Sequence, residues 1–395
     1  MPTRSVTAAL VLLTAILFAA VMVRRGAGHD YIQFHAAATL LAAGESPYGR
    51  DGQVREQCAL RGGIDLRDVE PDDLYAEIGI LPYFYPPWVA LAVVPLTFLN
   101  YPVAKALWIY LGSQALVIAG YFLSNRTTLR RHRPALTTAF ALGFMPALSA
   151  VEIGQVAPLV LLLLVLLLCS IESDQDLAAG FVLAWLTVKP QLSVVAIPAT
   201  LVWASRRGRW KVVASFAGSL AMLAIGSAAI LPDWPLRMIA ATREFPLPTA
   251  IDPSVGVTWL TFCQTMGIKG RALVFAYATG AVPAIWWTLR AAWDRKTPAA
   301  EAIGRGVFAA FFVAPYALGY DLTTLVFPVM VVESKLSTRG RIALIGIAMV
   351  VPHWTLSAVQ TGVPQIILFW MPLALAALWI YAERRRVSRL TPRPA

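Results

Sequence analysis

One aspartate, Asp30, stands where a carboxylate could take part in chemistry. It follows an apolar run, 6–23, and two arginines separate the run from it. The run is long enough to cross a bilayer as a helix, and carboxylates this close to hydrocarbon are uncommon and often functional. Asp30 is therefore a candidate general base, which needs hydrogen-bond reach to the hydroxyl whose proton it takes. The competing interpretation is a surface aspartate that caps a helix beginning near Ile32.

Two histidines flank this aspartate in the sequence. His35 is a candidate contact for a phosphate or a sugar, although a lone histidine is more often a satisfied polar group. His29 and His35 together with Asp30 also suggest a metal site. We expect no metal, because the cluster lacks a further nearby ligand of convincing spacing.

A lysine interrupts the apolar runs in the middle of the chain. Lys189 lies between two of them and precedes Pro190. A charge at membrane depth usually faces a cavity or a partner, but a lysine that snorkels to the interface would look the same in the sequence. For a ligand that carries phosphate, Lys189 with Gln191 is the first candidate contact. Arg243, in the second long polar segment, is the next.

Other polar side chains stand within or beside apolar runs. Gln155 is a candidate to bond a ligand hydroxyl or a neighbouring helix. Tyr85 precedes two prolines that start a membrane segment rigidly, so it serves either this turn or the stacking of a sugar. Tyr320 and Asp321 open a later apolar run, and Ser254 is a candidate acceptor contact.

The composition identifies an integral membrane protein. Hydrophobic residues make up 58% of the 395, charged residues only 14%, and the mean hydropathy is +0.65. A soluble domain carries about 25% charged residues. The net charge of +11 does not indicate nucleic acid as a partner, because the basic residues cluster in short gaps between apolar runs. That pattern is typical of cytoplasmic loops.

The apolar runs predict an all-α, polytopic bundle that forms one domain, residues 1–395. About 13 runs are long enough to consider, and we expect about 12 crossings, because two cytoplasmic ends require an even number. The run 86–99 is the one expected to re-enter the membrane without crossing it.

Two long polar segments, 24–83 and 232–270, are expected on the outer side. The alternation of crossings places Gln155, Lys189 and Asp321 on that same face. A short helix at the membrane surface is expected at 32–43, which contains few helix breakers.

Three cysteines are too few for a disulfide framework. Cys169 lies in an apolar run and is expected to be inert. Cys58 and Cys263 both fall in the outer segments, where pairing is chemically allowed, but we expect two free thiols.

A series of short motifs in the first half of the chain resembles a known family. The motifs are Asp-Tyr-x-x-Phe, Gly-x-x-Pro-Tyr, Phe-x-Tyr-Pro-Pro, Gly-Gln-x-x-x-Leu, and Ala-Gly followed by Lys-Pro. In this order they resemble glycosyltransferase family 87, a family of multi-span enzymes of the GT-C architecture that use polyprenyl-phosphate sugars. The matching positions are Asp30, Tyr31, Phe34, Gly44, Pro47, Tyr48, Phe84, Tyr85, Pro86, Pro87, Gly154, Gln155, Ala179, Gly180, Lys189 and Pro190.

The resemblance implies a GT-C-type bundle with a long first outer loop and an inverting transferase that needs no cofactor. The donor would be a polyprenyl-phosphate hexose, with mannose as the expected sugar. The acceptor would be a glycolipid or glycan at the outer, periplasmic face of a bacterial inner membrane, among membrane lipids. Family members place their catalytic aspartate in the first outer loop, which favours Asp30 as the base.

For such a transfer, Tyr48, Tyr85, Gln155, Tyr320 and Asp321 are the candidates expected around the sugar and acceptor. The segment 314–321 departs from the family pattern, which carries a histidine or a Ser-Pro there. Which group contacts the donor phosphate is therefore open.

Two other function classes fit a multi-span chain. A transporter or flippase of lipid-linked sugars would also explain the crossings and a buried Lys189. It would not explain the long first outer segment, and the chain shows no repeated half of the kind that many transporters have. A non-catalytic partner in polymer assembly would show no turnover with any sugar donor.

Overall fold

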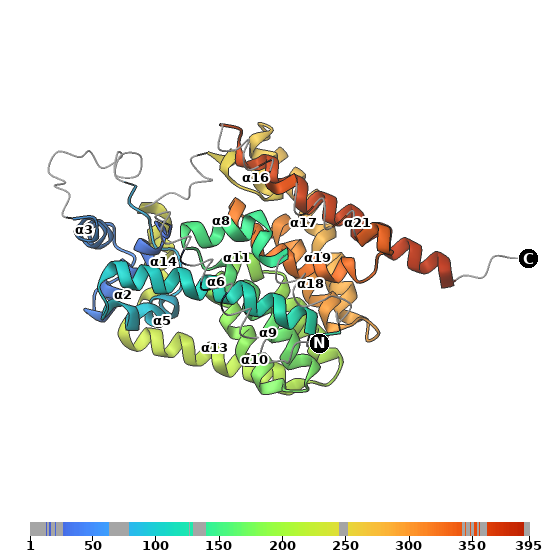
Figure 1. The fold of residues 1–395 in the computed structure, drawn as a ribbon, viewed down its shortest axis with the longest axis horizontal. Coiled ribbons are helices and arrows are strands. Elements are labelled where there is room, and N and C mark those ends of the chain that lie inside the picture. The colour runs from blue at the N-terminus through green and yellow to red at the C-terminus, as the bar shows by residue number, and fades with distance from the viewer. Residues whose placement is uncertain are drawn as a thin grey trace, which may run out of the picture.

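The computed structural model describes residues 27–62, 79–125, 127–128, 140–244, 252–341 and 362–390, with isolated positions elsewhere. Every secondary-structure element of these residues is a helix, which confirms the all-α prediction (Figure 1). Of the first apolar run, 6–23, only Leu13, Ile16 and Ala20 are described, and all three are helical. The rest of that run, and parts of both long polar segments (63–78 and 245–251), lie outside the described residues.

Four helices form the N-terminal part of the described chain: α2 (Tyr31–Ala42), α3 (Arg50–Leu60), α5 (Pro87–Thr97) and α6 (Tyr101–Asn125). Helix α2 matches the short helix expected at 32–43. It packs against α5 and α3, and nearly all of its residues are buried. Its three consecutive alanines, Ala36 to Ala38, are fully buried, so neighbouring helices approach it closely.

Helix α5 starts at a pair of prolines. Pro86 is its N-cap and Pro87 its first residue, where the missing N–H costs no helical hydrogen bond. The helix has 11 residues, which span about 16 Å of a hydrocarbon core about 30 Å thick. A helix this short does not cross a bilayer alone, so a re-entrant path at 86–99 stays our prediction.

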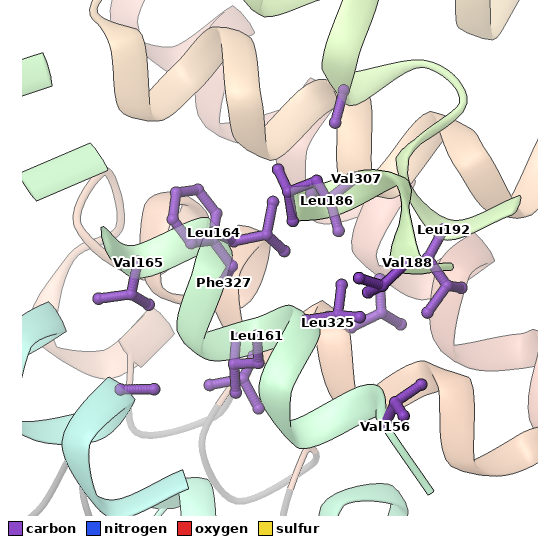
Figure 2. Packing of buried hydrophobic residues seen from close by; sticks show 14 of the residues in the cluster. Val156, Leu161, Leu164, Val165, Leu186, Val188, Leu192, Val307, Leu325 and Phe327 are labelled. Atoms are coloured by element: carbon purple, nitrogen blue, oxygen red, sulfur yellow. The ribbon is translucent and has the colours of Figure 1, made fainter. Parts of the chain in front are cut away.

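The central helices carry the core around α9, as Figure 2 shows. Buried leucine and valine side chains of α9 pack against residues of the later helices, including Leu186, Leu325 and Phe327. Van der Waals packing of this kind holds helices together where lipid surrounds the protein. The central elements are α8 (Met145–Ile153), α9 (Ala157–Glu172), α10 (Asp176–Trp185), η1 (Leu186–Val188), α11 (Pro190–Ser193), α12 (Ala196–Arg206) and α13 (Trp210–Ile230).

Helices α10 and α13 approach each other at Gly180. A Cβ at this position would lie 2.4 Å from the carbonyl oxygen of Val212, so no larger residue fits. The Ala179-Gly180 pair of the sequence motif therefore has a packing role, because small residues let two helix backbones meet.

The C-terminal part completes the bundle, and α21 runs along one side of it (Figure 1). Buried residues of one cluster extend from Ala27 to Ala382. The elements of this part are α14 (Trp234–Glu244), η2 (Pro253–Val255), α16 (Trp259–Thr265), α17 (Gly270–Trp293), α18 (Ala299–Val313), η3 (Gly319–Leu325), α19 (Val326–Glu333), η4 (Gln365–Phe369) and α21 (Trp370–Leu390).

Four stretches of the described chain are long and apolar enough to cross a membrane: Tyr101–Asn125, Trp210–Ile230, Gly270–Trp293 and Gln365–Glu383. Other apolar runs form shorter helices. For example, α8 has 9 residues and α19 has 8, which is about half the length that a crossing needs. The number of about 12 crossings stays a prediction.

Candidate functional site

The site is built on a backbone contact between the start of α2 and the turn after α8. The N–H of Gly28 donates to the carbonyl of Glu152 at 2.6 Å, and the N–H of Asp30 donates to the carbonyl of Ile153 at 2.8 Å. Gly154 closes the turn with a φ of +82°, a left-handed conformation that suits glycine. The turn therefore fixes where the next side chain, Gln155, points.

The carboxylate of Asp30 faces this turn. Asp30 is the N-cap residue of α2, but its side chain makes no capping hydrogen bond. Its Oδ2 accepts a hydrogen bond from Gln155 Nε2 at 2.5 Å, and its Oδ1 lies 2.8 Å from His29 Nε2. The interpretation of Asp30 as a surface cap is therefore wrong, because its carboxylate is mostly buried and is engaged by side chains.

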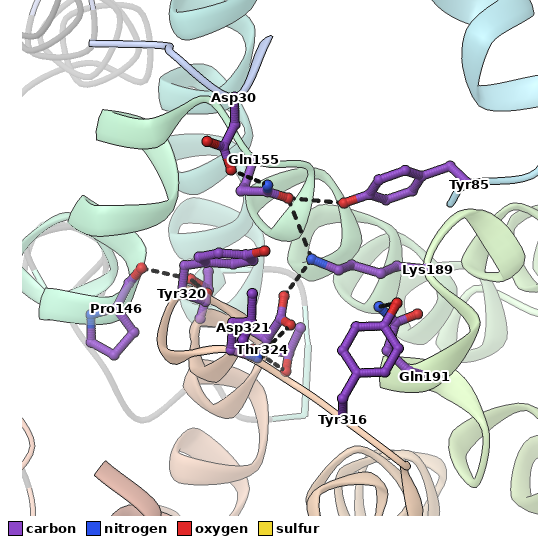
Figure 3. Close-up of polar contacts among 12 residues, drawn as sticks. Asp30, Tyr85, Pro146, Gln155, Lys189, Gln191, Tyr316, Tyr320, Asp321 and Thr324 are labelled. Carbon is purple, nitrogen blue, oxygen red and sulfur yellow. Dashed lines mark hydrogen bonds and ion pairs between the residues drawn. The ribbon is translucent and has the colours of Figure 1, made fainter. Parts of the chain in front are cut away.

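A chain of polar contacts leads inward from Gln155 (Figure 3). The Oε1 of Gln155 accepts from the hydroxyl of Tyr85 at 3.0 Å and from Lys189 Nζ at 3.4 Å. Lys189 Nζ donates to Asp321 Oδ1 at 2.5 Å and lies 4.6 Å from the centre of the Tyr320 ring. Lys189 and Asp321 are 2% and 1% exposed, so this ion pair lies fully inside the protein.

These groups adjoin a cavity of about 140 Å³. The cavity brings together six residues that the sequence analysis selected: Asp30, Tyr85, Gln155, Lys189, Gln191 and Tyr320. The remaining lining residues are Gln33, Leu81, Pro82, Phe84, Tyr316 and Leu318. Residues far apart in the sequence therefore meet at one polar cavity.

Two further candidates support the cavity from behind its lining. Asp321 holds Lys189 with one oxygen and accepts the backbone N–H of Leu318 with the other, at 3.0 Å. Tyr48 donates its hydroxyl to the carbonyl oxygen of Tyr85 at 2.9 Å. Both were expected to contact sugar or acceptor, and both are instead placed to hold lining residues.

Three candidates lie elsewhere. His35 is a buried residue of α2, where its ring meets Tyr31 and Tyr101 edge-on, and burial lowers its pKa. Arg243 is exposed on α14. Ser254 lies in η2, where its hydroxyl donates to Asp252 at 2.9 Å. None of the three lines this cavity.

The structure adds two polar lining residues that the sequence analysis missed. Gln33 stands three residues after Asp30, and this spacing on a helix puts both on one face, so the sequence did contain a signal. Tyr316 comes from the segment 314–321, and its hydroxyl accepts from Gln191 Nε2 at 3.3 Å. Its place at the cavity depends on the fold of that segment, which no local spacing indicates.

No group of three or more histidine, cysteine, aspartate or glutamate side chains suited to a metal ion occurs among the described residues. The three cysteines are free, with Cys58 and Cys263 buried, which confirms the expectation of two free thiols. The contacts at the cavity are hydrogen bonds and ion pairs among carboxylate, amide, phenol, imidazole and ammonium groups.

The helices and composition define a membrane protein with a polar cavity inside its helical bundle. The model of glycosyltransferase family 87 matches residues 83–315, which is more than half of the chain. The chain belongs to this family and is a glycosyltransferase, as its motifs predicted. No curated protein and no solved structure matches it. The matched region contains Tyr85, Gln155 and Lys189 but ends before Asp321 and starts after Asp30.

Proposed function

We propose that the protein transfers a hexose, with mannose as the first candidate, from a polyprenyl-phosphate donor to a glycolipid or glycan acceptor. Transfer would take place at the outer face of a bacterial inner membrane, with Asp30 as the general base. The observation that carries this proposal is the position of the Asp30 carboxylate on the wall of a polar cavity. The matched family region supplies other walls of the same cavity, from Tyr85 to Gln191.

The proposed reaction is one displacement at the anomeric carbon. The acceptor hydroxyl gives its proton to Asp30 while its oxygen bonds to the anomeric carbon. The bond from that carbon to the phosphate oxygen breaks, and the phosphate leaves with the electron pair. Attack opposite the leaving group inverts the configuration. The phosphate is already a good leaving group, so the step requires a positioned base and hydrogen-bond donors to the leaving oxygen.

The donor phosphate needs contacts at the cavity. Of the four residues proposed for this role, Lys189 and Gln191 line the cavity, whereas Arg243 and His35 do not. The charge of Lys189 is compensated by Asp321. The amide nitrogen of Gln191 has only a long 3.3 Å contact to the Tyr316 hydroxyl. Gln191 is therefore the hydrogen-bonding side chain that turns more easily toward the phosphate. Sugar and acceptor would meet Tyr85, Tyr320 and Gln33.

Membership of a glycosyltransferase family favours transfer over the transporter alternative. The test uses purified protein in nanodiscs with polyprenyl-phosphate mannose labelled in the sugar and a membrane glycolipid extract. The readouts are release of polyprenyl phosphate and label in a new product. Asp30→Asn should lower turnover by about 100- to 10,000-fold, the usual contribution of a positioned base, while donor affinity changes little.

The matched control is Asp51→Asn, the same substitution at an exposed position of α3. It should keep wild-type turnover. Turnover that survives in Asp30→Asn would move the base elsewhere. A wild-type protein that releases nothing from mannose, glucose, galactose or arabinose donors would refute the proposed donor class.

A further inference from the structure

The contacts of Gln155 fix the orientation of its side-chain amide. Its oxygen lies near two donors, the Tyr85 hydroxyl and Lys189 Nζ, at 3.0 and 3.4 Å. Its nitrogen lies 2.5 Å from the Asp30 carboxylate. Turning the amide over would place N–H groups against an ammonium, which has no acceptor, and an oxygen against a carboxylate. The amide therefore has one satisfied orientation, with its N–H toward Asp30.

Lys189 enforces this orientation because it is itself held in place. Asp321 accepts a hydrogen bond from Lys189 Nζ, and the aromatic ring of Tyr320 lies beside the ammonium group. The second oxygen of Asp321 is occupied by the N–H of Leu318. Both members of the ion pair are buried, so Lys189 acts as a fixed hydrogen-bond donor toward Gln155.

We propose that Gln155 is the positioning residue for the general base, and that the buried Lys189–Asp321 pair sets the orientation of its amide. This inference rests on the proposed function, in which Asp30 is the base. With Oδ2 held by Gln155, the carboxylate has one oxygen, Oδ1, left for the acceptor hydroxyl. The partner of Oδ1 is His29, whose side chain is 67% exposed and can move aside.

The backbone makes this proposal testable. The backbone hydrogen bonds of Gly28 and Asp30 to the turn after α8 do not involve the Gln155 side chain. A Gln155→Met variant therefore keeps the size of the residue and the path of the chain, while it loses the side-chain N–H donor and the carbonyl acceptor. The matched control is Gln175→Met, the same substitution at an exposed loop position.

The experiment measures kcat and the donor KM of Gln155→Met. We expect kcat to fall by about 10- to 100-fold, the range for a lost hydrogen bond to a charged group, with KM within about threefold by the same reasoning. A sugar-binding role for Gln155 would instead raise KM. A merely structural role would lower the melting temperature and leave kcat of the folded fraction unchanged. Either of these results would overturn the proposal.

A second readout needs no turnover. His29 and Gln155 share the Asp30 carboxylate, so loss of the amide should strengthen the His29 contact and move the titration midpoint of its ring to higher pH in NMR spectra. An unchanged midpoint would show that Gln155 does not act on Asp30. If Asp30→Asn is inactive and Gln155→Met is fully active, this inference is refuted while the proposed function stands. Wild-type inactivity would refute the proposed donor, and the His29 midpoint would still decide the inference.

Discussion

At the scale of single residues, the carboxylate of Asp30 changes the pKa of the neighbouring His29. The hydrogen bond to Asp30 raises the pKa of His29 above its usual value of 6.5, and burial works against this rise. We expect the His29 ring to titrate above pH 6.5 in wild-type protein and closer to 6.5 in Asp30→Asn. Because the pKa of His29 is raised in the folded state, its contact with Asp30 stabilises the folded protein fully below pH 6.5. This stabilisation is lost as the pH rises through the raised pKa.

The measurement is NMR of ring-labelled histidine, with the His29 signal assigned by its absence in His29→Gln. The chain has 4 histidines, and the signal of His35 serves as an internal control, because burial lowers its pKa. Equal His29 midpoints in wild type and Asp30→Asn would contradict the contact on which the site depends.

The buried ion pair is a poor first target for mutation. Removing one partner of such a pair leaves an unpaired buried charge and costs about 3–5 kcal/mol. Lys189→Met or Asp321→Asn would therefore lower the stability of the protein and its activity together. Gln155 is neutral, so its replacement tests the same chain of contacts without leaving a buried charge.

At the scale of secondary-structure elements, the turn between α8 and α9 determines how α2 is held. A Cβ at Gly154 would lie 3.0 Å from the Cα of Gly28, and the residue has a positive φ. Gly154→Ala therefore meets both backbone strain of about 1–2 kcal/mol and a clash that displaces Asp30. We expect a loss of stability of that order and a loss of turnover that stability alone does not explain.

Gly208→Ala is the matched control for this prediction. Gly208 also has a positive φ, of +72°, but a Cβ there would meet no atom within 4 Å. It should show the strain in its melting temperature and keep turnover in the folded fraction. Equal effects of both variants on turnover would show that the turn does not position the base.

Much of the site could be predicted from the sequence, since ionised and amide side chains beside apolar runs are costly unless they have partners. That argument selected Asp30, Gln155 and Lys189. It does not tell which groups pair, so it predicts a phosphate contact for Lys189 although Asp321 compensates the charge of this lysine. Arg243 was selected for its charge alone, and its exposure on α14 depends on tertiary packing.

The fold class could be predicted, but the number of crossings could not. An apolar run indicates only that a segment is removed from water. Either lipid or surrounding protein can do this. Helix α19 is a short helix whose residues are all buried by protein, and its apolar run resembles that of a crossing helix. The length of the helix in the folded chain distinguishes a crossing helix from a buried one. Proline and glycine positions in the sequence predict that length only loosely.

At the scale of the whole molecule, two of the four candidate spans face away from the protein. In the most apolar stretch of each helix, the buried share is 6% for α13 and 11% for α17, compared with 50% for α6. Large apolar side chains such as Met222 and Phe275 are exposed on α13 and α17. An apolar surface of this kind on an integral membrane protein is satisfied by lipid. We therefore infer that α13 and α17 each present a lipid-facing surface of the bundle.

This inference predicts where a label meets lipid. A spin label at Met222→Cys should be reached by oxygen and shielded from a water-soluble nickel complex in nanodiscs, since oxygen partitions into hydrocarbon. A label at Asp233→Cys, just beyond the end of α13, should show the reverse. The native cysteines would first be replaced by alanine. Equal nickel accessibility at the two positions would place α13 outside the bilayer and remove it from the crossings.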